Sequence, residues 1–333
     1  MSSTVRFDQR QDHQQVPALI GTSREASSMR DFARTAAKSE CALLIRGETG
    51  TGKDNLAEFI HHLGRRDRDF VPVICEAMME SVFETELFGH TQGAFTDARA
   101  AKPGLVQVAS EGTLFFNEVG YIPLNLQAKF LRVLERKTFR AIGGTQEIHV
   151  NARIIAATNA NLEAAVQCGR LRSDLYHRLN AVTCMMAPLR DHRDDIPPLV
   201  EHFLRRQAVE KKFSPETMSV MIDYYWPGNI RELKNAVERA VFRSDGTRII
   251  QPEHVRPYLT GVGGEKFELV ENTEGKFPTL QQAQQNYFRV VLKRANGNMI
   301  RAAKIAGIAR NTMYNKVQEF QLQDFAKSLK EQV

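Results

Sequence analysis

The chain has few cysteines and lacks a long apolar run. Its four cysteines, Cys41, Cys75, Cys168 and Cys184, are far apart and form no CxxC pair, which argues against a zinc site or a disulfide framework. No apolar stretch approaches the ~20 residues that a membrane-spanning helix needs. The polar start, MSSTVRFDQRQDHQQVP, has no hydrophobic segment of the secretory type. We therefore expect a cytoplasmic protein with reduced thiols and no membrane partner.

The composition predicts packed domains and allows an acidic polymer as a partner. Of the 333 residues, 42% are hydrophobic and 25% are charged, and the formal net charge is +6. This hydrophobic content is enough for a packed core, and the length suits two or three domains. The positive charge is compatible with nucleic-acid binding, although it is weak support alone.

Short apolar segments alternate with helical segments over residues 18–260. The segments with the length and composition of buried strands are CALLIRG (41–47), FVPVIC (70–75), GTLFF (112–116) and ARIIAAT (152–158). Amphipathic stretches such as 54–64 and 125–136 lie between them. Strands that are apolar throughout are typical of a parallel sheet covered by helices on both faces. The pattern therefore predicts an α/β, doubly wound fold.

Beyond about residue 190 the strands are expected to stop, and the chain is predicted to be helical. Gly-rich and charged residues near position 270 indicate a linker. The predicted organisation is a flexible tail (1–17), an α/β subdomain (18–190), a helical lid (191–260), a linker (261–278) and a small all-α domain (279–333).

The segment GETGTGK follows a predicted strand, precedes a predicted helix and has the spacing G-x-x-x-x-G-K. Glycines let backbone N–H groups turn toward phosphate oxygens, and the helix N-terminus adds partial positive charge. The residue after Lys53 is Asp54, where a hydroxyl side chain is usual. The residues predicted to bind a nucleotide are Gly47, Glu48, Thr49, Gly50, Thr51, Gly52, Lys53 and Asp54.

A second apolar segment, residues 113–116, ends at Asn117 and Glu118. Phosphoryl transfer needs a second strand whose end faces the metal and the attacking water. Glu118 is the candidate catalytic base, and Asn117 stands where a metal-facing aspartate is expected. An amide can accept a hydrogen bond from metal-bound water but carries no charge, so Asn117 predicts a weak Mg²⁺ site.

The stretch ELFGHTQGAFTDA (86–98) closely resembles the ELFGH…GAFTGA signature of bacterial sigma-54-dependent activators, also called enhancer-binding proteins. Segments in the order of that family cover most of the chain, among them GETGTGKD, GTLFFNEVG, VNARIIAATNANL, LRSDLYHRLN, PLRDHRDDI and WPGNIRELKNAVERAV. The resemblance implies an AAA+ P-loop domain with a parallel sheet and a helical lid. It further implies ATP and Mg²⁺ as cofactors and a homo-oligomeric ring, a hexamer, that remodels sigma-54 RNA polymerase.

The resemblance also implies roles for single residues around the nucleotide. Thr158 and Asn159 are similar to sensor I, and Arg231 to sensor II. Arg172 and Arg178 resemble the arginine fingers that reach the γ-phosphate bound by a neighbouring subunit. A guanidinium is permanently charged and can contact two phosphate oxygens, which fits these roles.

By the same resemblance, Phe95 and Thr96 would contact sigma-54 from the tip of a surface loop. Three positions depart from the family pattern. Asn117 replaces the Walker B aspartate, Asp97 replaces the second glycine of GAFTGA, and Ile74 stands where the family usually has an asparagine. Nucleotide binding is therefore expected, whereas ATP hydrolysis is left open.

The C-terminal segment predicts a helix-turn-helix. Asn298 can cap one helix, Gly307 lies in the turn, and a second helix starts near Arg310. The segment strongly resembles Fis-type DNA-binding domains, which implies a dimeric unit on an upstream activating sequence. The candidate DNA-binding residues are Arg301, Lys304, Arg310, Asn311, Thr312, Tyr314, Asn315 and Lys316. Apolar positions expected to pack and dimerise the unit are Ala283, Tyr287, Val290 and Val291.

Two functional hypotheses remain open. The first is a DNA-bound AAA+ activator that works with sigma-54 polymerase. Because no receiver domain is recognised, we expect it to be controlled by a bound partner, by its expression level or by a small ligand that binds the AAA+ domain. The second is a nucleotide-binding regulator that hydrolyses ATP weakly or not at all and acts independently of sigma-54. Asn117, Asp97 and Ile74 favour the second. An AAA+ chaperone or clamp loader is disfavoured by the helix-turn-helix and the GAFTDA segment.

Overall fold

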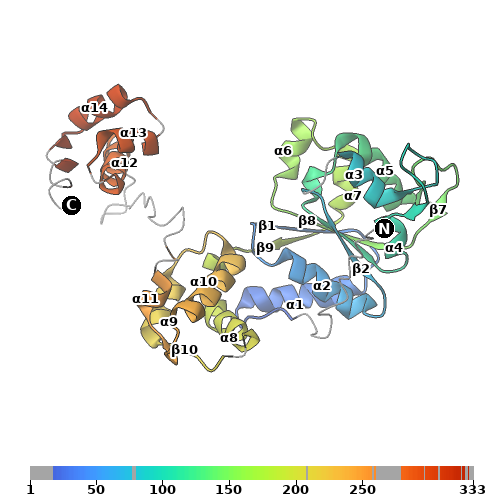
Figure 1. The fold of residues 1–333 in the computed structure, drawn as a ribbon, viewed down its shortest axis with the longest axis horizontal. Helices are drawn as coiled ribbons and strands as arrows, with labels where there is room; N and C mark the ends of the chain where they lie inside the picture. Colours follow the sequence, from blue (N-terminus) through green and yellow to red (C-terminus); the bar gives the residue numbers. More distant parts are fainter. Residues whose placement is uncertain are drawn as a thin grey trace. The chain divides into compact units, whose positions relative to one another are not determined.

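The computed structural model describes residues 18–76, 80–207, 209–256, 259, 279–295, 297–306, 308–323, 325–326 and 329. For Leu280, Ala283, Arg294, Lys304 and Asn311 it describes the backbone only. The chain forms two compact units, Met1–Val262 and Gly263–Val333 (Figure 1). Within the described ranges, no helix is both long and apolar enough to cross a membrane.

A five-stranded parallel sheet forms the centre of the first unit, in the order β2-β5-β8-β1-β9. Its strands are β1 (Leu43–Gly47), β2 (Phe70–Ile74), β5 (Thr113–Asn117), β8 (Arg153–Thr158) and β9 (Val182–Met186). The four strands predicted from the sequence are present, and the α/β parallel-sheet fold is confirmed. The edge strand β9 was not predicted, because only one of its residues is buried and its sequence has no continuous apolar run.

Helices cover both faces of this sheet (Figure 1). One face carries α1 (Arg24–Ala37) and α2 (Lys53–Arg65), which pack on β1 and on Phe115. The other face carries α3 (Glu80–Phe88), α4 (Leu105–Ala109), α5 (Leu124–Arg136), α6 (Leu162–Gln167) and α7 (Ser173–Leu179). Strand β5 serves both layers, because Phe115 faces the first pair of helices while Leu114 and Phe116 face the second group.

The lid has its own core, built around the single tryptophan. Its helices are α8 (Ile196–Arg206), α9 (Pro215–Asp223), α10 (Asn229–Arg243) and α11 (Pro252–Val255). Trp226 is fully buried, and its indole N–H donates to the carbonyl of Met221 at 2.7 Å. The expectation that strands stop near residue 190 was wrong in one respect: β10 (Lys212–Phe213) and β11 (Ile249–Ile250) form a two-residue parallel pair. Pairs this short have no periodicity to read from a sequence.

Two small antiparallel pairs complete the first unit. They are β3 (Gly89–His90) with β4 (Lys102–Pro103), and β6 (Thr138–Phe139) with β7 (Ile148–His149). Three short 3-10 turns, η1 (Val119–Tyr121), η2 (Leu189–Asp191) and η3 (Arg193–Asp195), connect larger elements.

The second unit is helical, as predicted. It contains α12 (Leu280–Arg294), α13 (Met299–Ala306) and α14 (Arg310–Glu319). The Asn298 side chain accepts from the backbone N–H groups of Ile300 and Arg301 at 3.0 and 3.2 Å, so the predicted cap is confirmed. Val291 is buried in the core of the unit, and Tyr287 packs against it. The predicted turn residue Gly307 lies outside the described residues.

The double-sided burial of β5 leads to a prediction about stability. Phe116→Ala should lower the free energy of unfolding by about 3–5 kcal/mol, because a fully buried ring would leave a cavity behind β5. Phe242→Ala, at a site that is 85% exposed, is the matched control and should change it by less than about 0.5 kcal/mol. Urea unfolding followed by far-ultraviolet circular dichroism measures both, and equal effects would contradict the assigned packing.

Candidate functional site

The order of the sheet brings three loops together at one edge. In a parallel sheet the carboxyl ends of all strands meet at the same edge, and β8 lies between β1 and β5. The loop after β8 therefore separates the phosphate loop from Glu118. Asn159 bridges them: its backbone N–H donates to Glu118 Oε2 at 2.8 Å, and its side-chain amide donates to Thr49 Oγ1 at 2.8 Å. The candidate sensor I residue thus contacts both other elements.

The phosphate loop has the backbone geometry that its glycines permit. Gly50 and Gly52 have φ values of 81° and 94°, which favour glycine. Lys53 opens α2 and is 5% exposed. Its ammonium donates to the carbonyls of Gly47 and Glu48 at 3.0 and 3.2 Å and lies 3.4 Å from Glu118 Oε1. The lysine and the candidate base are therefore next to each other.

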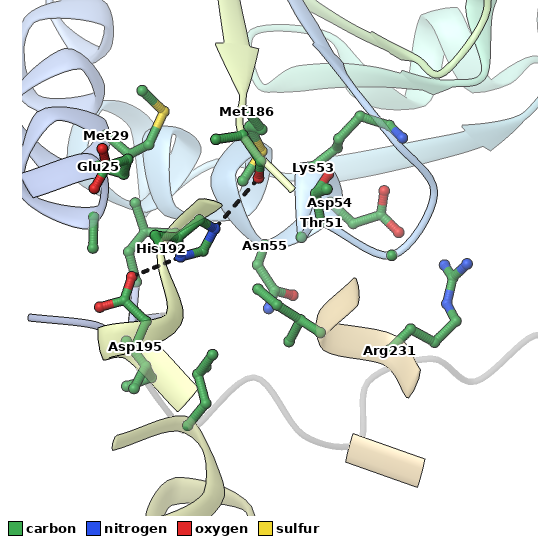
Figure 2. Close-up of a pocket in the computed structure, with 18 of the residues that line it drawn as sticks. Glu25, Met29, Thr51, Lys53, Asp54, Asn55, Met186, His192, Asp195 and Arg231 are labelled. Carbon is green, nitrogen blue, oxygen red and sulfur yellow. Dashed lines mark hydrogen bonds and ion pairs between the residues drawn. The ribbon is translucent and has the colours of Figure 1, made fainter. Parts of the chain in front are cut away.

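The loop from Thr49 to Asp54 lines a pocket of about 630 Å³ together with Glu118 and Asn159 (Figure 2). Its apolar lining residues include Leu19, Ile20, Met29, Met186 and Ile230. Its polar lining residues include Lys53, Asp54, Asn117, Glu118 and Arg231. Figure 2 shows Arg231 on the lid side, directed toward Lys53 and Asp54. A pocket that combines apolar side chains with a phosphate loop is suited to a nucleotide, which has an apolar ring and charged phosphates.

The predicted nucleotide-binding residues divide into two groups. Those from Thr49 to Asp54, together with Asn159 and Arg231, line the pocket. Gly47 and Glu48 are described but are absent from the lining, and Glu48 is bound to the lid instead. Thr158 is buried, and its hydroxyl accepts from the N–H of Ala160 at 3.0 Å, so it shapes the turn.

Few oxygen atoms of the described residues near Lys53 could bind Mg²⁺. Magnesium usually takes one or two protein carboxylates together with phosphate oxygens and water. Asp54 and Glu118 supply two carboxylates in the pocket, and Asn117 supplies an amide. Desolvation raises the pKa of Asp54 above its usual value, while Arg231, Lys53 and the Asn117 side chain oppose that rise. The set fits a nucleotide-bound Mg²⁺, but with one charge fewer than an aspartate at 117 would give.

A buried carboxylate, that of Asp195, holds one wall of the pocket in place. Asp195 accepts from the N–H groups of Thr22 and Ser23 at 2.6 and 2.8 Å and from Ser23 Oγ at 2.6 Å. His192 Nδ1 lies 2.9 Å from it (Figure 2). Burial would raise the pKa of Asp195, but these hydrogen bonds outweigh burial and lower it. Asp195 thereby joins the start of the lid to residues 22–23.

The two candidate arginine fingers lie outside this pocket. Arg172 precedes α7, Arg178 lies in its last turn, and both are exposed. Arg172 makes two hydrogen bonds to the Asp174 carboxylate, at 3.0 and 2.7 Å. Neither arginine is among the described residues that line the pocket.

The segment that resembles GAFTGA forms a loop between β3 and β4. Phe95, Thr96 and Asp97 are exposed; Phe95 is 44% exposed, and its ring centroid lies 4.9 Å from that of His90. Asp97 is not among the residues with positive φ, so its side chain causes no strain of that kind here. The loop is closed by one backbone hydrogen bond, in which the N–H of Gly93 donates to the carbonyl of Ala98 at 2.9 Å.

A second loop, between β6 and β7, supports the first at its base. The N–H of Thr91 donates to the carbonyl of Ile142 at 3.0 Å, and the N–H of Ile142 donates to Gly89 at 2.9 Å. Gly143 has a φ of 75°, and a Cβ there would lie 2.8 Å from Ala94 Cβ. The two loops therefore form one small surface element.

Another exposed polar face lies on the second unit. Met313, Val317 and Phe320 bury one side of α14 in the core of that unit. The opposite side exposes residues named from the sequence, namely Arg310, Thr312, Tyr314 and Asn315, and Arg301 is exposed on α13. Lys316 is half-buried and pairs with Glu319 at 2.8 Å. The side chains of Lys304 and Asn311 lie outside the description.

Sequence reasoning missed the residues that join the lid to the rest of the unit. Arg190, Asp195 and Asn229 make their key contacts with residues 142 to 181 positions away. The only signal in the sequence was their place in the segments PLRDHRDDI and WPGNIREL, which the resemblance had already identified.

Comparisons with known families agree with this architecture. Residues 19–185 match the Sigma-54 interaction domain, residues 190–269 the AAA+ ATPase lid domain, and residues 279–320 the Bacterial regulatory protein, Fis family. A receiver domain is not among these matches.

Relatives and solved structures extend the similarity over most of the chain. The chain is 41% identical to the regulatory protein AtoC of Escherichia coli, over 88% of this chain and 66% of AtoC. It is 40% identical to the sigma-54-dependent transcriptional activator SfnR of Pseudomonas putida, over 88% of this chain and 81% of SfnR. It covers 44% of the Nif-specific regulatory protein of Herbaspirillum seropedicae, at 44% identity.

A crystal structure of NtrX from Brucella abortus in complex with ATP matches 92% of this chain and 70% of that chain, with a TM-score of 0.67 and 29% identity. An NtrX structure without named nucleotide matches 91% and 69%, with a TM-score of 0.68 and 30% identity. The matched domains, their order and the identity to these relatives lead to one conclusion: the chain belongs to the family of sigma-54-dependent AAA+ transcriptional regulators that carry a Fis-type helix-turn-helix.

Proposed function

We propose that the protein is an ATP-dependent transcriptional activator that binds an upstream DNA sequence and remodels sigma-54 RNA polymerase as a hexameric ring. The observation that carries the proposal is the contact chain at the nucleotide pocket, from Thr49 through Asn159 to Glu118 and Lys53. This arrangement joins a phosphate loop, a sensor and a candidate base within hydrogen-bonding distance. A packed core alone would not require it.

In this proposal, Lys53 and the N–H groups of the phosphate loop bind the terminal phosphates of ATP. Glu118 orients the attacking water, and Asn159 reports on the γ-phosphate because it contacts both Thr49 and Glu118. Bound Mg²⁺ would neutralise charge on the phosphate oxygens, with Asp54, Asn117 and Glu118 as its nearest protein donors. The apolar side chains of the pocket would contact the adenine ring of ATP and exclude water from it.

Arg172 and Arg178 would complete a site on the adjacent subunit. Both are exposed at the ends of α7 and outside the pocket of their own chain. A guanidinium supplied across an interface couples hydrolysis to ring assembly. The loop with Phe95 and Thr96 would then transmit the nucleotide state to sigma-54.

The proposal also includes the domain limits predicted from the sequence and a cytoplasmic location. Control would come from a partner protein or a small ligand that acts on the AAA+ body. The C-terminal unit would act as a dimer on DNA, with α14 in the major groove.

A second candidate function is favoured by one observation, the amide of Asn117 at the end of β5. It is a regulator that binds ATP as a structural ligand, hydrolyses it weakly or not at all, and acts independently of sigma-54. The two candidates differ first in whether ATP is turned over.

ATP hydrolysis by the full chain with Mg²⁺ tests the first candidate. We expect turnover per subunit that rises with protein concentration, because the arginine fingers act across an interface. Asn117→Asp should raise this turnover about tenfold or more, since a restored carboxylate holds Mg²⁺ more firmly. ATP binding without turnover in the parent protein, rescued by Asn117→Asp, would support the second candidate.

The contact with sigma-54 can be tested at the loop. Thr96→Ala and Phe95→Ala should each weaken binding to purified sigma-54 by about tenfold or more, because a few central side chains carry most of the energy of such contacts. Arg140→Ala, an exposed change in the neighbouring loop, is the matched control. ATP binding measured on the same samples should stay unchanged. Full sigma-54 binding by both loop variants would refute this role of the loop.

DNA binding can be tested on α14. Arg310→Ala combined with Lys316→Ala should weaken binding to a fragment selected by the parent protein from a random-sequence pool by about tenfold or more. Lys293→Ala, an exposed change on α12, serves as the control. Titrations at several salt concentrations should also show a shallower salt dependence for the double variant. Tight specific binding by that variant would exclude α14 as the recognition helix.

A further inference from the structure

We propose that Glu48 is a positioning residue that latches the phosphate loop to the lid, so that nucleotide binding and the position of Arg231 are coupled. The inference rests on the proposed nucleotide binding and deepens it. It assigns Glu48 to the lid, although its place in the phosphate-loop sequence suggests contact with the nucleotide.

The Glu48 carboxylate makes three contacts with the lid. Arg190 Nη1 donates to Oε2 at 2.8 Å and Nη2 to Oε1 at 2.5 Å, and Asn229 Nδ2 donates to Oε2 at 3.2 Å. The paired geometry of the two Arg190 bonds is the strong and specific form of an arginine–carboxylate contact. The hydrogen bonds from Arg190 lower the pKa of Glu48, so the carboxylate is charged at neutral pH.

The lid side of the latch is held in place by its own neighbours. The Arg190 guanidinium lies over the ring of Tyr225, 4.9 Å from its centroid. Asn229 is fully buried, has a φ of 52°, and accepts from the N–H of Leu189 at 2.9 Å. The Asn229 side chain is thus bonded to the backbone of Leu189, the residue before Arg190. A shift of Asn229 would therefore also shift the backbone at Arg190.

The latch continues directly to Arg231. Asn229 Nδ2 also donates to the carbonyl of Thr49 at 3.0 Å, and the N–H of Arg231 donates to the carbonyl of Gly50 at 3.2 Å. The loop and the lid approach so closely that a Cβ on Gly50 would lie 2.3 Å from the carbonyl oxygen of Gly228. A shift of the loop on phosphate binding would thus move the first turn of α10, which carries Arg231.

Glu48 and Arg190 lie outside the described lining of the pocket, whereas Arg231 is part of it. An effect of either residue on nucleotide binding would therefore act through position and not through contact. The carboxylate of Glu48 is 45% exposed and the guanidinium of Arg190 21% exposed, so water can replace their bonds. A pair of this kind can open and close, which a fully buried pair would resist.

A double-mutant cycle between Glu48 and Arg231 tests the latch in the full chain. The affinity for a fluorescent ATP analogue with Mg²⁺ is measured for the parent, Glu48→Gln, Arg231→Ala and the double variant. Arg231→Ala should weaken binding about tenfold in the parent but about twofold or less in Glu48→Gln, because an unlatched lid no longer holds Arg231 at the phosphates. A second cycle with Arg190→Ala in place of Glu48→Gln should show the same loss of the Arg231 effect. Arg190→Ala leaves the sequence of the phosphate loop unchanged.

Hydrogen exchange of the first turn of α10 gives a second readout. In the parent protein ATP should slow exchange in residues 229–233, and in Glu48→Gln this response should be lost. Glu201→Gln is the matched control, because it breaks the exposed 2.6 Å pair with Arg205 in the same lid and should change neither readout.

The outcomes separate the latch from the proposed function. Additive effects in the cycle, with ATP bound by the parent, would overturn the latch and leave nucleotide binding intact. Loss of coupling in Glu48→Gln but not in Arg190→Ala would also overturn it, since Glu48 would then act on the nucleotide directly. A parent protein that binds no ATP would refute both.

Discussion

The position of β8 between β1 and β5 is the constraint on which the rest of the site depends. In this strand order the loop after β8 has to lie between the phosphate loop and the end of β5. Asn159 occupies that place and contacts both. Glu118 adopts a left-handed backbone conformation, with a φ of 60°, directly after β5, and that turn directs its carboxylate toward Lys53 and Asn159. The arrangement of the site is thus a consequence of sheet topology together with one residue in a left-handed backbone conformation.

The phosphate loop borders the pocket on one side and the lid on the other, so it connects the two. Its residues from Thr49 to Asp54 line the pocket, while the Glu48 side chain and the carbonyls of Thr49 and Gly50 bind the lid. Asp195 joins the lid to residues 22–23 on the other side of the pocket. The lid is therefore fixed at two sides of the same cavity, although its own core is separate from that of the sheet. A ligand in the pocket would therefore lie between the two sets of contacts that hold the lid, those of the phosphate loop and those of Asp195.

The elements predicted well are those whose signal is local. Buried strands, the glycine spacing of the phosphate loop and the cap at Asn298 depend on neighbours a few residues apart, and each is found where the sequence indicated. The edge strand β9 and the pair β10–β11 are short and largely exposed, so no apolar pattern marks them. The contacts of Glu48 with Arg190 span 142 positions, and only the folded chain brings them together. The fold was therefore accessible from the sequence, whereas the connection between loop and lid was not.

The amide at Asn117 is consistent with the charges around it. Asp54 interacts with Arg231 and Lys53, and Glu118 Oε1 lies 3.4 Å from the Lys53 ammonium, so two carboxylates already face these cations. Glu118 raises the pKa of Asp54 and the Asn117 side chain lowers it, although desolvation has the largest effect. An aspartate at 117 would add another carboxylate beside Asp54, and like charges that lie close together disfavour ionisation of one another. With asparagine there, the carboxylates that face Lys53 are those of Asp54 on α2 and Glu118 after β5, and the last residue of β5 adds no further negative charge between them and the phosphate loop.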